Sequence, residues 1–175
     1  DGGTATGNSV THTYTQFGVF PVTAEIECNG CKFAINTKAS VPVEADFNYS
    51  VACGANGSYT VTLNNTSQTL GGWTYSPSTD VTWTSSCGTP LSGTGNVLTL
   101  NTPANCNPTV TMTITVTDPV TNQSCTDSKT ITLNLPTQPL AIVSPAAVCK
   151  GQISMFNYNW TGPAIVQHEW TVGGT

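Results

Sequence analysis

Apolar and polar residues alternate one by one along most of this chain. In Val110–Thr117 every second residue is Val, Met or Ile, and each residue between them is Thr. An extended backbone points successive side chains to opposite faces, so the pattern predicts a strand with one apolar and one hydroxyl-rich face. The same pattern predicts strands at residues 10–14, 20–26, 58–63, 81–83, 97–100 and 128–135. No segment has the apolar spacing of an amphipathic helix.

Clusters of Gly, Pro and Asn separate the predicted strands. One is the sequence Cys-Asn-Gly-Cys at residues 28–31, where Asn-Gly favours a tight hairpin turn. Others lie at residues 71–72, 76–77, 88–90, 93–95 and 118–119. Short strands joined by frequent turns predict an all-β fold made of tandem immunoglobulin-like β-sandwiches.

The chain also contains an internal repeat. Trp83 and Trp170 are 87 residues apart, and each follows a Cys-bearing segment, at Cys53 and Cys149. The alternating stretch 19–26 corresponds to 111–117, and each precedes a turn with a cysteine. The repeat predicts the late half of a module at residues 1–43, a complete module at 44–136 and the early half of another at 137–175. We expect the chain to be a fragment whose two half-modules form one sandwich only when successive copies or repeats supply them.

The first 27 residues resemble the second half of a PKD (polycystic kidney disease) domain. That family has the pattern W-x-F-G-D-G, then V-x-H-x-Y, a Gly-bearing turn and an alternating strand. The matching residues are Asp1, Gly2, Val10, His12, Tyr14, Gly18, Phe20 and Val22. The stretch 148–174 is similar to the opening half of PKD-like modules in large surface proteins of Bacteroidota. The central module is similar in layout, but Trp83-Thr-Ser-Ser replaces W-x-F-G.

The resemblance implies seven-stranded sandwiches that serve as spacers, stalks or adhesive arrays in secreted or cell-surface proteins. It also implies that Tyr14 and Phe20 are core residues of the first half-module. Trp83 and Trp170 are expected to anchor the cores of their own modules, as a buried strand Trp does in immunoglobulin-type sandwiches.

Charge restricts the partners of this chain. Charged residues make up 7% of it, the net charge is −5, and no arginine is present. A surface without basic runs cannot neutralise a row of phosphates, which argues against nucleic acid and anionic membranes as partners. No run of 18 apolar residues occurs, so no membrane-spanning helix and no membrane insertion are predicted.

Seven cysteines in a β-rich chain predict a disulfide framework and an extracellular location. We expect Cys53 to pair with Cys125 and Cys87 with Cys106. Cys31 has two alternatives, a Cys149-type residue of the preceding repeat or Cys28 across the Asn-Gly turn. Because seven is odd, at least one sulfur is free or bonded outside this sequence.

No constellation predicts catalysis or a resident cofactor. His12 and His168 read as structural residues, and Glu25 and Glu27 lie on one face of a strand rather than facing each other as a glycosidase pair. No pair of CxxC motifs supports zinc. Asp1 and Asp118 suggest at most a weak calcium site, because acidic residues are scattered along the chain.

The leading hypothesis is therefore a structural segment of a repetitive extracellular adhesin, stalk or filament, with Pro-rich joints at 39–44 and 135–139 setting its stiffness. Its partners would be neighbouring repeats or copies of itself. The alternative is a carbohydrate-binding accessory module of a secreted hydrolase that contacts surface glycans through Trp73 and Tyr75, which lie in a Gly- and Pro-rich loop. The favoured interpretation of these two rings is instead that they fold over the edge of the sandwich or pack on the neighbouring module.

Overall fold

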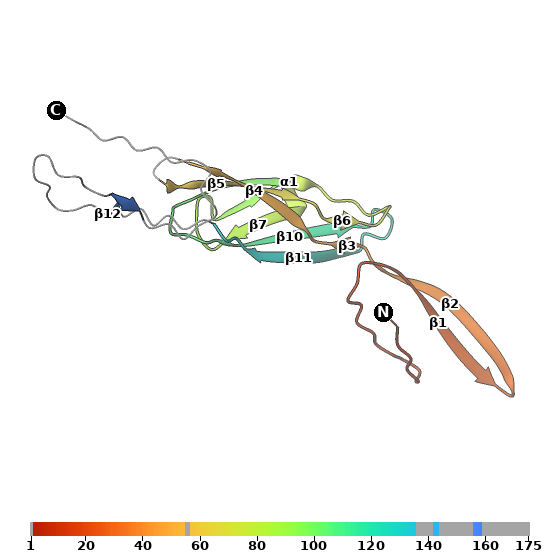
Figure 1. Ribbon diagram of the computed structural model, residues 1–175. Helices are drawn as coiled ribbons and strands as arrows, with labels where there is room; N and C mark the ends of the chain where they lie inside the picture. The colour runs from red at the N-terminus through yellow and green to blue at the C-terminus, as the bar shows by residue number, and fades with distance from the viewer. Residues whose placement is uncertain (1, 55–56, 136–141, 144–155, 159–175) are drawn as a thin grey trace, which may run out of the picture.

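The computed structural model describes residues 2–54, 57–135, 142–143 and 156–158. Within these residues the protein is all-β, apart from the single helical turn α1 (Pro77–Asp80). Two antiparallel sheets form the centre of the molecule (Figure 1). The smaller has the order β4-β5-β9, with β4 (Phe47–Cys53), β5 (Tyr59–Asn65) and β9 (Val97–Thr102). The larger has the order β11-β10-β7-β8, with β11 (Ser124–Thr132), β10 (Thr109–Thr117), β7 (Val81–Ser85) and β8 (Ser92–Thr94).

The hydrophobic core lies between these two sheets. The alternating stretch of β10 turns Val110, Met112, Ile114 and Val116 inward, where they are fully buried, while the threonines between them stay partly exposed. Strands β5 and β9 show the same alternation of burial from the opposite sheet. Full burial of one such apolar side chain contributes about 1.5–3 kcal/mol. The period-two pattern of the sequence is therefore the source of the sandwich core.

The outward face of β10 is bonded to β11 through hydroxyl groups. Thr111 and Thr130 lie opposite each other with their Oγ1 atoms 2.8 Å apart, and Thr115 and Thr126 repeat the arrangement at 2.9 Å. Cross-strand threonine pairs of this kind contribute about 0.2–1 kcal/mol each. The hydroxyl-rich face thus aligns the two strands without contributing to the core.

Trp83 on β7 is the largest side chain in the core and is 1% exposed. Its ring meets Phe47 of the opposing sheet edge-on, with ring centroids 5.2 Å apart. The indole Nε1 donates a hydrogen bond of 2.7 Å to the carbonyl of Gly95. Trp83 therefore bridges the two sheets, as expected of a core anchor.

A separate hairpin lies beyond one end of the sandwich (Figure 1). It consists of β1 (Gly18–Cys28) and β2 (Cys31–Val41), which form a two-stranded antiparallel sheet of their own. Pro42 alone separates β2 from β3 (Val43–Glu44), which pairs with β6 (Gln68–Thr69) at the edge of the sandwich. The last described strands, β12 (Ile142–Val143) and β13 (Asn157–Tyr158), pair with each other.

Two local expectations from the sequence differ from the structure. The alternation at residues 10–14 predicts a strand, yet these residues form no regular element in the structure. The predicted turn at Ser76–Pro77 begins the helical turn α1 instead. Pro77 occupies the first turn of α1, and the Asp80 carboxylate accepts a hydrogen bond of 2.6 Å from the Ser76 N–H.

Candidate functional site

The β1–β2 hairpin is the feature of the described structure that points most directly to a function. Its turn follows from the local sequence, since Asn29 and Gly30 have φ angles of 50° and 79°. Asn and Gly tolerate positive φ at both central positions, which gives a two-residue turn whose twist matches the strands. The turn fixes the register so that Cys28 faces Cys31 and Ile26 faces Phe33.

One face of the hairpin is apolar, and most of it is exposed. Val22 and Ile26 on β1 are 37% and 53% exposed, and Phe33 and Ile35 on β2 are 59% and 61% exposed. The register places Ala24 opposite Ile35, so these side chains form one continuous patch along both strands. Contiguous exposed apolar surface of this kind marks an interaction site, and an isolated two-stranded hairpin is only marginally stable in water.

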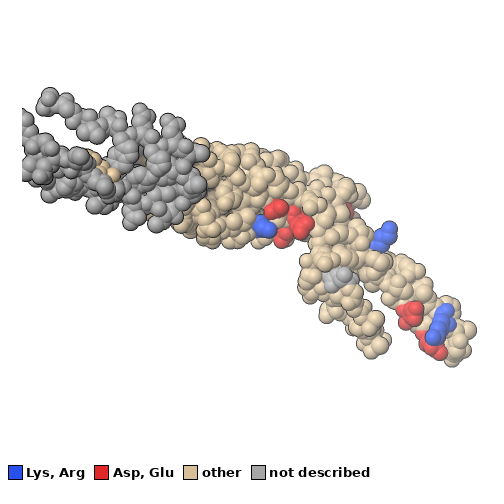
Figure 2. Space-filling model, in the orientation of Figure 1, with Lys and Arg blue, Asp and Glu red and all other residues tan. Residues whose placement is uncertain are grey.

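The other face of the hairpin is polar. Glu27 forms an ion pair with Lys32 directly across the strands, with 3.9 Å between Nζ and Oε2, and the Thr23 hydroxyl donates a 2.8 Å hydrogen bond to the Asn36 side chain. On the side drawn in Figure 2, charged side chains gather on the hairpin and at the adjoining end of the sandwich. The hairpin is therefore amphipathic, with one face suited to water and one suited to a partner.

Three aromatic rings meet near the base of the hairpin. Tyr14 stacks on Phe20 with ring centroids 4.9 Å apart, and His12 meets Tyr14 edge-on at 4.7 Å. Tyr14 and Phe20 are half-buried and lie outside the sandwich core. Tyr14 of the V-x-H-x-Y motif thus packs on Phe20 of β1. The role of Tyr14 and Phe20 as core anchors of a module stays a prediction.

The joint between hairpin and sandwich is pinned by several bonds. The Ala45 N–H donates a 2.7 Å hydrogen bond to the Asp127 carboxylate of β11, and the Leu70 N–H donates to the Pro42 carbonyl at 2.9 Å. Val43 and Ala45 are buried in the sandwich core. Because the backbone of Pro42 and Ala45 is hydrogen-bonded and the side chains of Val43 and Ala45 are buried, the hairpin is connected through an ordered segment rather than a flexible linker.

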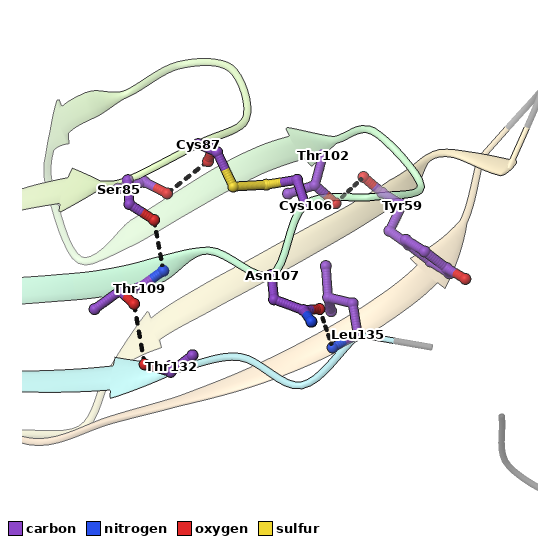
Figure 3. Close-up of a disulfide and its surroundings, with 10 residues drawn as sticks. Tyr59, Ser85, Cys87, Thr102, Cys106, Asn107, Thr109, Thr132 and Leu135 are labelled. Atoms are coloured by element: carbon purple, nitrogen blue, oxygen red, sulfur yellow. Dashed lines mark hydrogen bonds between the residues drawn. A yellow bond between two sulfur atoms is a disulfide. The ribbon is translucent and has the colours of Figure 1, made fainter. Parts of the chain in front are cut away.

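The disulfide predicted between Cys87 and Cys106 is present, with Cα atoms 6.3 Å apart (Figure 3). It joins the loop that follows β7 to the loop that precedes β10. The Ser85 hydroxyl donates to the Cys87 carbonyl at 2.7 Å, and the Asn107 side chain accepts the Leu135 N–H at 3.1 Å. Closing a loop of this length contributes about 3 kcal/mol in the chain-entropy account. The bond therefore fastens one end of the sandwich.

The predicted pairing of Cys53 with Cys125 is wrong, because both are free thiols. Ala45 is bonded to Asp127, close to Cys125 in sequence, whereas Cys53 ends β4 after that strand has run the length of the sandwich. At about 3.3 Å per residue the two cysteines are on the order of 20 Å apart, and a disulfide needs Cα atoms within about 7 Å. The sequence pattern identified two strands of one module but not the ends at which their cysteines lie.

The remaining cysteines do not form a bond in the described part of the chain. Cys28 and Cys31 face each other across the hairpin turn, and both are exposed free thiols. The alternative pairing of Cys31 with a Cys149-type residue remains a prediction, because Cys149 lies outside the described residues, as do Trp170, His168 and Asp1.

Trp73 and Tyr75 are partly buried and pack against the sandwich core. Thr74 between them forms an isolated bridge to β10, where its N–H donates to the Thr117 carbonyl at 3.0 Å and its carbonyl accepts the Thr117 N–H at 2.8 Å. The bridge holds the loop against the sandwich edge. This arrangement supports the packing alternative rather than a pair of free rings for stacking on sugars.

The acidic side chains and His12 of the described residues do not gather at one place. No group of three His, Cys, Asp or Glu side chains that could hold a metal ion occurs among the described residues. The Asp118 carboxylate is used within its own loop, where it accepts the Thr121 hydroxyl at 2.7 Å and the Val120 N–H at 2.9 Å. These hydrogen bonds, the Thr121 hydroxyl first, hold the pKa of Asp118 below its usual value.

Sequence reasoning missed the character of β2. Phe33 and Ile35 alternate with Lys32, Ala34 and Asn36, which is the period-two signal of a half-buried strand. That signal was present in the sequence, whereas the exposure of its apolar face appears only in the structure.

Among the described residues, none of the helical segments has the length and hydropathy of a membrane-spanning helix. No protein-family model matches this chain, and no curated protein or solved structure shows significant similarity to it.

Proposed function

We propose that this chain is a structural segment of a repetitive extracellular adhesin, stalk or filament. In this proposal it is built from tandem PKD-type, immunoglobulin-like sandwiches and acts by mechanical reach and attachment, without catalysis. The observation that carries the proposal is the amphipathic hairpin, which is joined by a pinned connection to one end of a complete sandwich and whose apolar face is exposed at Ile26, Phe33 and Ile35.

The strand order of the sandwich supports the immunoglobulin-like assignment. The orders β4-β5-β9 and β11-β10-β7-β8 correspond to strands A-B-E and G-F-C-C′ of that architecture. Trp83 on β7 then occupies the position of the buried Trp on strand C. The disulfide departs from the pattern, because it links two loops at one end instead of strands B and F.

The ordered joint supports a mechanical role. In arrays of modules, stiffness depends on the segments between them, and Pro-containing connectors resist bending. Here Pro42 lies between two strands that are both hydrogen-bonded, and Ala45 is fixed to Asp127 of β11. A segment built in this way transmits orientation from the hairpin to the sandwich.

The proposal is tested by negative-stain electron microscopy of the native full-length protein. We expect a fibre with beads about 2–3 nm apart, because strands of seven to nine residues at about 3.3 Å per residue set the length of one sandwich. Compact separate particles without an axial repeat would contradict an array and would move the weight to an accessory module.

A further inference from the structure

The central sandwich contains a hairpin, β10–β11, that corresponds to the β1–β2 hairpin and is covered by other strands. Its β10–β11 hairpin has the free edge of β10 paired with β7, where Met112 faces Trp83. Its inward side is covered by β5 and β9, so that Val110, Met112, Ile114 and Val116 are fully buried. One additional edge strand and one additional sheet therefore complete such a hairpin.

The β1–β2 hairpin has the same inward pattern but lacks both partners. When Phe20, the first of the alternating apolar residues of β1, is aligned with Val110 of β10, the alternating residues of the two strands take the same places, with Val22 in the position of Met112. The four residues of β1 are Phe20, Val22, Ala24 and Ile26. The hairpin is a two-stranded sheet, so among the described residues the second edge of β1 has no strand beside it.

We propose that the apolar face and free edge of this hairpin bind residues 137–175 of a second copy of this chain. The strand around Trp170 of that copy pairs with β1, and Trp170 faces Val22 as Trp83 faces Met112. This proposal rests on the proposed function and names the partner of its site: another copy, attached through a strand that one molecule donates to the next.

The sequence of the donated segment fits this place. It contains the same Trp-Thr pair at Trp170 that β7 contains at Trp83, and a Val-Cys segment at Cys149 that resembles the end of β4. Its only charged residues are Lys150 and Glu169, while its apolar residues are numerous. An apolar-rich segment with little charge matches an apolar face that carries no charge, and pairing along an open edge supplies main-chain hydrogen bonds.

The direction of the chain indicates a second copy rather than self-closure. Figure 1 places the β1–β2 hairpin and β12 beyond opposite ends of the sandwich. The described strand β12 of the donor segment and the acceptor hairpin thus lie at opposite ends of one sandwich. Contacts of this head-to-tail kind do not close on two copies and continue into an open chain of molecules.

Two variants, each with one end disabled, test the proposal. Ile35→Asp places a charge on the acceptor face, and Trp170→Asp removes the central side chain of the donor. In sedimentation-velocity experiments the unmodified chain should form longer assemblies as its concentration rises, while each variant alone should remain monomeric. An equimolar mixture of the two variants should form a dimer and stop there, because one functional acceptor meets one functional donor.

The matched control is Asn36→Asp, which adds the same charge to the polar face next to position 35. This variant should assemble like the unmodified chain, whereas Ile35→Asp should weaken assembly about 30-fold or more, the effect expected of a central interface residue. Positions 35 and 170 both lie outside residues 44–136, which contain the central sandwich. An unchanged unfolding transition of that sandwich therefore verifies that the Ile35→Asp and Trp170→Asp variants are folded. Non-reducing gels show whether any assembly depends on disulfides between chains.

Three outcomes would overturn the inference. The unmodified chain could stay monomeric at about 100 µM, a concentration that saturates interfaces with micromolar affinity. Trp170→Asp alone could still associate, which would mean that two hairpin faces pack on each other. The mixture of variants could remain monomeric. A beaded fibre in electron microscopy together with any of these results would leave the proposed array intact and disprove only the exchange of strands between copies.

Discussion

The indole Nε1 of Trp83 donates a 2.7 Å hydrogen bond to the carbonyl of Gly95, from a side chain that is 1% exposed. The bond satisfies the polar atom of the largest core residue and attaches the β8–β9 turn to β7. A buried polar group needs such a partner, because leaving it unpaired costs about 1–3 kcal/mol. This relationship leads to the first prediction.

Trp83→Phe should lower the free energy of unfolding by about 2–4 kcal/mol, because it leaves a cavity beside Phe47 and removes the donor to Gly95. Urea unfolding followed by circular dichroism measures the change. Trp73→Phe is the control, since Trp73 is only partly buried and should cost less. Equal losses for the two variants would mean that Trp83 does not anchor the core.

Replacing both Cys87 and Cys106 by Ala should lower the free energy of unfolding by about 3 kcal/mol, because the unfolded chain regains the entropy of an open loop. Thermal unfolding with and without reductant measures the effect, and reductant should have no effect on the double variant. Cys53→Ala, at an exposed free thiol, should change stability by less than about 0.5 kcal/mol. A large loss for Cys53→Ala would indicate a bond that the present arrangement excludes.

Trp73→Ala tests the carbohydrate-binding alternative. Because Trp73 packs against the sandwich core, the substitution should reduce stability by about 1–3 kcal/mol and leave glycan-array signals at background in both proteins. Thermal unfolding and array binding are measured on the same samples. Specific glycan binding that is lost in Trp73→Ala at unchanged stability would favour an accessory module over a stalk.

The loop at Asp118 should loosen in acid. Hydrogen bonds from Thr121 and Val120 lower the pKa of Asp118 in the folded state, so the ionised carboxylate stabilises the fold above the unfolded pKa near 3.8. That stabilisation is lost as the pH falls through the lowered folded pKa. Carboxyl-detected NMR titration of Asp118 should show this direction, and Thr121→Val should move the pKa back toward its usual value. An unchanged pKa in Thr121→Val would remove the Thr121 hydroxyl as its cause.

Local patterns predicted the features that depend on neighbouring residues. The Asn29-Gly30 turn formed as expected, because positive φ angles are a property of those two residues. The alternation in 110–117 correctly identified which side chains of β10 face the core. Residues 10–14 carry a similar alternation but form no strand, because a strand also requires a backbone partner that the local pattern does not specify.

The cysteines show the same division. Cys87 and Cys106 lie in loops at the same end of the sandwich and form a disulfide. Cys53 is the last residue of β4 and Cys125 lies near the start of β11, and both are free thiols. The repeat pattern assigned both pairs to one module but contained no information on which strand ends meet.

The strand faces, the hairpin turn and the low charge can be read from the amino-acid sequence, since each depends on the nature and spacing of adjacent residues. Three features emerge only when the chain is folded: Trp73 and Tyr75 pack inward, the Ala45 N–H donates to the Asp127 carboxylate, and Ile35 is exposed. The physical reason is that burial and strand pairing depend on which distant segments come together. A period-two pattern specifies that a face must be covered, but not which part of the chain, or which copy, covers it.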